Sequence, residues 1–117
     1  MIDTSKLVEF FTLNPRQFSV LKAITISQGN SVTGVYEQHV SLVLVKATDD
    51  DSESLCLEFH GVQKLQISQP DASVVTIHLN ILDGSTVPDR DCVFFVRDAE
   101  LDRVICFECR DFEAFTA

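Results

Sequence analysis

The residues of this chain with the most chemical potential are three histidines and four cysteines. His39, His60 and His78 are too far apart in the sequence to chelate a metal from one helix or loop, so only folding could bring them together. Glu58 lies two residues before His60, and the alternation of a strand would place both side chains on one face. A histidine held by a carboxylate forms half of many catalytic sites. No nucleophile accompanies this pair in the local sequence, so a polar pair on an edge strand explains it more simply.

The four cysteines are Cys56, Cys92, Cys106 and Cys109. The last two have the spacing of a zinc knuckle, but a knuckle needs a turn that brings both sulfurs to one side. Their apolar neighbours indicate a strand instead, in which residues three apart point to opposite faces. We therefore expect free thiols that are buried as small hydrophobic side chains in a reducing compartment.

An acidic run from Asp49 to Glu53 could suggest calcium. A calcium-binding loop of the EF-hand type needs a glycine at its sixth position and a glutamate at its twelfth, where this chain has Ser54 and His60. We therefore predict a solvated loop, and no metal or other cofactor.

A second group of acids lies between Arg97 and Arg103. Ion pairing across a hairpin would explain this interleaving, and each such pair contributes little to stability. Alternatively, the two acidic segments form a recognition surface that attracts and orients a basic partner. On that interpretation the partner-binding residues are Asp49, Asp50, Asp51, Glu53, Asp98, Glu100 and Asp102.

The negative charge is concentrated in the later part of the chain. Residues 1–48 carry four basic and three acidic groups, a net charge of +1, and residues 49–117 carry five basic and fifteen acidic groups, a net charge of −10. Phosphate binding requires basic patches, so this charge disfavours nucleic acid and anionic membranes and favours a basic protein partner.

The size and composition indicate one globular domain over residues 1–117, with 45% hydrophobic residues. The segment from Met1 to Thr12 contains Asp3 and no basic cluster, unlike a signal peptide. No apolar run approaches the ~20 residues that span a membrane. We expect a soluble cytoplasmic protein.

The pattern of apolar residues predicts one helix followed by strands. Asp3 or Thr4 can cap the helix, and Pro15 ends it. Strands are expected from residue 18 to a turn at 28–31, over 40–47 with both faces covered, over 55–59 before a bulge at Gly61, and over 65–67, 75–81, 92–97 and 103–109. Phe112 and Phe115 are expected to fold back over a sheet end.

The connections in the second half are too short for the crossovers of parallel strands. We therefore expect a mainly β (α+β) fold, in which an antiparallel sheet curls into a sandwich or half-barrel with the short N-terminal helix on a face or an edge.

Two stretches of the chain resemble a known type of protein. Residues 57–65 follow the sequence pattern apolar-x-Phe-x-Gly-Val-x-x-Leu. Residues 95–98 and 104–113 look like a closing hairpin that lies beside this segment. Over residues 55–113 the chain resembles small uncharacterised bacterial proteins, including cytoplasmic immunity proteins that neutralise polymorphic toxins. The resemblance implies tight binding to a toxin domain, often through acidic residues, and assigns no defined residue set.

Three functions follow as hypotheses. The first is a non-enzymatic, immunity-type inhibitor that occludes the active site of a basic toxin. The second is a structural or assembly subunit that forms homo-oligomers through a sheet edge. The third is a small hydrolase or isomerase built around His60 and Glu58.

Overall fold

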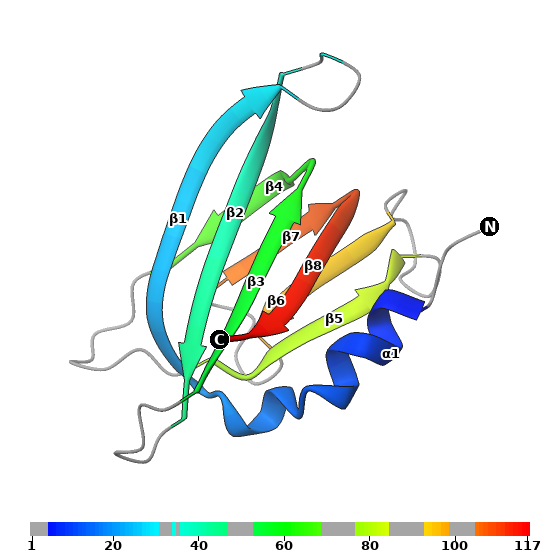
Figure 1. Cartoon of the computed structure of the whole chain (residues 1–117). Coiled ribbons are helices and arrows are strands. Elements are labelled where there is room, and N and C mark those ends of the chain that lie inside the picture. The colour runs from blue at the N-terminus through cyan, green and yellow to red at the C-terminus, as the bar shows by residue number, and fades with distance from the viewer. Residues whose placement is uncertain are drawn as a thin grey trace.

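The chain forms two packed antiparallel sheets with a helix along one side (Figure 1). The computed structural model describes residues 5–30, 34, 36–46, 53–68, 77–84, 93–98 and 105–117. Its helical elements are α1 (Ser5–Thr12) and the short 3-10 helix η1 (Pro15–Gln17). Its strands are β1 (Val20–Asn30), β2 (Tyr36–Val45), β3 (Ser54–His60), β4 (Gln63–Ile67), β5 (Leu79–Asp83), β6 (Phe94–Asp98), β7 (Ile105–Cys109) and β8 (Asp111–Thr116).

Within the described residues, each sheet has four strands. Sheet A has the order β1-β2-β3-β8, and sheet B has the order β4-β7-β6-β5. Every pairing between neighbouring strands is antiparallel, as the short connections predicted. The expected mainly β fold is confirmed in its sandwich form, because the two sheets remain separate.

The chain passes between the two sheets at a corner formed by Gly61 and Arg110. Gly61 joins β3 of sheet A to β4 of sheet B, and Arg110 joins β7 of sheet B to β8 of sheet A. The Arg110 N–H donates to the His60 carbonyl oxygen at 3.0 Å, which ties the two crossings together. Gly61 has a φ of 65°, a conformation that glycine adopts without strain. The predicted bulge is therefore a change of sheet.

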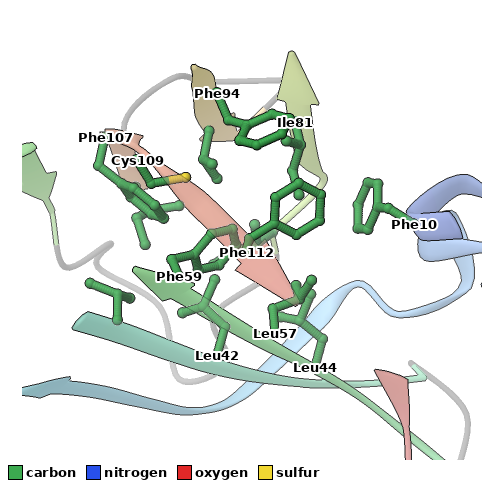
Figure 2. Close-up of a cluster of buried hydrophobic side chains, with 14 of the residues drawn as sticks. Phe10, Leu42, Leu44, Leu57, Phe59, Ile81, Phe94, Phe107, Cys109 and Phe112 are labelled. Atoms are coloured by element: carbon green, nitrogen blue, oxygen red, sulfur yellow. The ribbon is translucent and has the colours of Figure 1, made fainter. Parts of the chain in front are cut away.

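The core lies between the sheets and is rich in phenylalanine (Figure 2). Leu55, Leu57 and Phe59 are all fully buried, which confirms the alternation predicted for this strand. Phe112 lies at the centre of an aromatic group. Its ring centroid is 4.9 Å from that of Phe94, 5.9 Å from that of Phe59 and 6.3 Å from that of Phe10.

The helix covers an edge of the sandwich and contacts β8 of one sheet and β5 of the other (Figure 1). Phe10 is fully buried, whereas Val8 and Phe11 are exposed, so the helix buries only part of its apolar surface. Its predicted end is confirmed: Asn14 has a left-handed φ of 55° before Pro15. No helix in the described segments has the length and apolar character needed to cross a membrane.

Two predictions about the first hairpin were wrong. The turn expected at residues 28–31 begins later, because β1 keeps its pairing with β2 as far as Asn30 and Tyr36. β2 lies inside its sheet, as expected, but only its inward face, with Val40, Leu42 and Leu44, is fully buried. Its outward face is half-buried, because no second layer covers it in the described structure.

The prediction for the C-terminus was also wrong. Phe112 and Phe115 do not fold back over a sheet end but lie in β8, which pairs with β3. Alternation along β8 sends Phe112 into the core and leaves Phe115 on the outer face with 45% of its surface exposed. The strand predicted over 75–81 corresponds to β5, which begins later than predicted, at Leu79, since Ile77 and His78 are not in a strand; residues 75 and 76 lie outside the described residues.

Candidate functional site

Polar side chains lie close together on the outer face of sheet A, next to the corner. The inward residues of β2, β3 and β8 form the core, so residues of the opposite parity face outward. Beside the corner these outward residues are acids and histidines. We call them, together with the arginine of the corner, the corner cluster: Glu37, His39, Glu58, His60, Arg110 and Glu113.

Folding brings together two of the three histidines. β2 and β3 pair at Val40 and Phe59, and the next residues along this register are His39 and His60. Their imidazole rings lie edge to face with centroids 5.0 Å apart. Neither the spacing nor the composition of the sequence predicts this pair, because it depends on the register between two strands.

Glu37 links His39 to the corner arginine. The Glu37 Oε1 atom lies 3.2 Å from His39 Nε2. Arg110 Nη2 donates to both carboxylate oxygens of Glu37, at 3.0 and 3.2 Å. The Glu37 side chain is only 15% exposed, so this carboxylate is largely sheltered from solvent.

Glu58 and His60 share the outer face of β3, as strand alternation predicted. Glu58 is paired directly with Glu113 of β8. The possible ligand atoms of Glu58, His60 and Glu113 all lie within 4.8 Å of one another, and so do those of Glu37, His39 and His60. Within the described segments, neither Glu58 nor Glu113 forms an ion pair.

The Glu58–His60 pair lies on the outer face of sheet A, whereas the enzyme hypothesis expects it to line a hollow. A hollow of about 820 Å³ lies between η1 and the start of β5, and His78 lines it. A smaller one lies between α1 and β8. Glu58 and His60 line neither of these two hollows.

Five of the predicted partner-binding residues lie outside the described residues: Asp49, Asp50, Asp51, Glu100 and Asp102. Glu53 is described, and its side chain is 45% exposed with Oε2 3.6 Å from Lys46 Nζ. Asp98 is only 2% exposed, and its Oδ1 atom accepts a bond from the His78 N–H at 3.4 Å. Asp98 thus faces the interior and does not contribute to the protein surface.

The described cysteines are Cys56, Cys106 and Cys109, none of which forms a disulfide bond, and Cys92 lies outside the described residues. Cys109 shares its buried parity with Ile105 and Phe107, whereas Cys106 points to the other side of β7. The prediction that the last two cysteines face opposite sides of one strand is confirmed.

Comparison with known families identifies the class of this protein. The sequence model described as immunity protein PIM8 matches residues 2–115, almost the whole chain. The chain therefore belongs to the PIM8 family of immunity proteins. The resemblance seen over residues 55–113 is confirmed and extends to the N-terminal helix and the first hairpin. Searches among curated proteins and among solved structures found no match.

Proposed function

We propose that this protein neutralises a toxin domain in the cytoplasm by binding it, without chemistry of its own, and that the toxin presents a basic surface to it. The observation that carries the proposal is membership of an immunity-protein family over residues 2–115. An inhibitor of this kind needs a stable scaffold and a surface complementary to its target. The sandwich core supplies the first, and the charge distribution supports the second.

Charge supports a basic target. Residues 49–117 carry fifteen acidic and five basic groups, and the whole chain has a formal net charge of −9. A surface of one sign raises the rate of encounter with an oppositely charged partner and helps to orient it. Toxins that act on nucleic acid need basic surfaces for their own substrate, so an acidic inhibitor could cover such a surface directly.

The two acidic segments join strand ends remote from the corner. The first connects Val45 at the end of β2 with Ser54 at the start of β3, and the second connects Asp98 of β6 with Ile105 of β7. The corner, by contrast, lies at the opposite ends of β3 and β7. With Asp98 buried, the proposed contact residues are Asp49, Asp50, Asp51, Glu53, Glu100 and Asp102.

The test looks for a toxin domain among the genes beside that of this chain and measures its binding to the purified chain at low and at high salt. The variant Asp49→Asn/Asp50→Asn/Asp51→Asn should associate about tenfold more slowly than the wild type, because it removes charge at the proposed contact. The control variant Glu9→Gln/Glu58→Gln/Glu113→Gln changes the net charge by the same amount. Its substitutions lie on α1 and on the outer face of sheet A, away from the proposed contact. It should associate at nearly the wild-type rate.

Equal slowing by both variants would contradict the proposed contact and leave only a general effect of net charge. No binding by the wild-type protein at either salt concentration would contradict toxin binding itself. Binding that does not weaken with salt would contradict the basic character of the target surface.

A further inference from the structure

We infer that the corner cluster is a binding site for a divalent metal ion of the zinc type, with His39, His60 and Glu37 as its ligands. This site would be additional to toxin binding, and the argument for it does not depend on the proposed function. It rests on the geometry of the two imidazoles, the nearby carboxylates and the unfavourable pairing of like groups on this face.

The ligand types suit zinc. Zinc takes imidazole nitrogens and carboxylate oxygens, whereas calcium and magnesium prefer sites built from oxygen alone. The possible ligand atoms of Glu37, His39 and His60 all lie within 4.8 Å of one another. Three protein ligands would leave the fourth position of a tetrahedral ion for water or for a side chain of a partner.

The separation of the two rings also fits. With Zn–N bonds of about 2.0–2.1 Å and a tetrahedral angle, two imidazoles on one zinc ion have ring centroids about 5 Å apart. The centroids of His39 and His60 are 5.0 Å apart. Small side-chain rotations on two strands whose register is already fixed would bring both nitrogens onto a common ion.

The pairing of like groups on this face favours a cation. Glu58 lies directly opposite Glu113, an arrangement in which two negative charges repel each other. On the neighbouring strand pair, the ring of His39 lies beside that of His60. A divalent ion bound by the imidazole nitrogens relieves the repulsion between Glu58 and Glu113, since its charge attracts these two carboxylates on the far side of His60.

Arg110 competes with the metal for Glu37 and also orients it. Its guanidinium lies 3.0 Å from Oε1 and 3.2 Å from Oε2 of that carboxylate. A metal needs only one of these oxygens, so Arg110 can remain on the other and hold the carboxylate in place. Partners of this kind commonly fix the orientation of metal ligands. Without a metal, the same contacts form an ordinary network of ion pairs.

The experiment is a calorimetric titration of the metal-stripped full chain with zinc chloride, and separately with magnesium and calcium chloride. We expect one zinc ion per chain, a higher midpoint of thermal unfolding with zinc because it binds the folded state, and no comparable effect of magnesium or calcium. His39→Gln and His60→Gln should each weaken zinc binding about tenfold or more. His78→Gln removes the third histidine, which lies in the distant hollow, and should leave zinc binding unchanged.

Circular dichroism of each variant checks that the fold is retained, and cobalt(II) in place of zinc identifies the ligand atoms. A cobalt spectrum without a thiolate charge-transfer band agrees with histidine and carboxylate ligands. Three results would overturn the inference: no stoichiometric zinc binding, unchanged binding in both corner variants, or a thiolate band that places the ion on cysteine. None of these results bears on toxin binding, which the association measurements test separately.

Discussion

Gly61 is the residue on which the corner depends most directly. Its φ of 65° suits glycine, and a Cβ atom at this position would lie 2.9 Å from Arg110 Cβ and 3.3 Å from Glu37 Oε2. The missing side chain therefore allows Arg110 and Glu37 to approach each other over the turn. The same residue changes the direction of the chain and leaves space for the corner cluster.

Substitution of Gly61 by alanine should lower the free energy of unfolding by about 1–3 kcal/mol, because the left-handed backbone is strained in alanine and the added methyl group is crowded. Urea denaturation measures this change. Gly34 is a matched control, since its φ is 82° but nothing lies within 4 Å of a Cβ placed there. Gly34→Ala should cost less than Gly61→Ala, and equal losses would contradict the close packing at the corner.

At the scale of single residues, local alternation predicts only part of the site. It places Glu58 and His60 on one face, because those residues belong to one strand. It cannot place His39 beside His60, because that contact depends on how β2 aligns with β3. Alternation could, however, have found that Asp98 is buried, since it shares the parity of Phe94 and Val96 in β6.

At the scale of elements, β8 joins the helix to the sandwich. Phe112 packs against Phe10 of α1, Phe59 of β3 and Phe94 of β6, so one side chain connects both sheets and the helix (Figure 2). Lys6 of α1 also forms an ion pair with Asp111 and donates to the Phe112 carbonyl oxygen at 3.1 Å. The C-terminal strand is therefore central to the packing of the fold.

Truncation of Phe112 to alanine should lower the free energy of unfolding by about 3–5 kcal/mol, because it removes a fully buried ring and leaves a cavity. Phe115→Ala provides the control in the same strand, since this side chain is 45% exposed, and should cost well under half as much. Chemical denaturation of both variants measures the difference. Similar losses would show that Phe112 does not have the central place in the core described above.

The elements that can be predicted from the sequence are those with a pattern among neighbouring residues. Leu55, Leu57 and Phe59 repeat with period two, and the short connection between β6 and β7 predicts their pairing. The strand β8 has no such signal, because Phe112 and Phe115 have opposite parity and look like two residues of an irregular segment. The change of sheet at Gly61 also escapes prediction, since a bulge and a corner have the same glycine signature.

At the scale of the whole molecule, two regions differ in their chemistry. The acidic segments connect β2 with β3 and β6 with β7, and the corner lies at the opposite ends of β3 and β7. The first is proposed to bind the toxin, and the second is inferred to bind a metal ion. Because the two regions share no proposed residue, a variant of one should leave the other function intact.

The central claim is that this immunity protein acts by neutralising a toxin, and survival of cells tests it most directly. The toxin domain found among the neighbouring genes by the binding test is expressed in a sensitive bacterial host, with and without this chain, and colonies are counted. We predict that the wild-type chain and the variant Glu9→Gln/Glu58→Gln/Glu113→Gln restore survival, and that Asp49→Asn/Asp50→Asn/Asp51→Asn restores it less well. Equal killing with and without the folded, expressed wild-type chain would contradict the account.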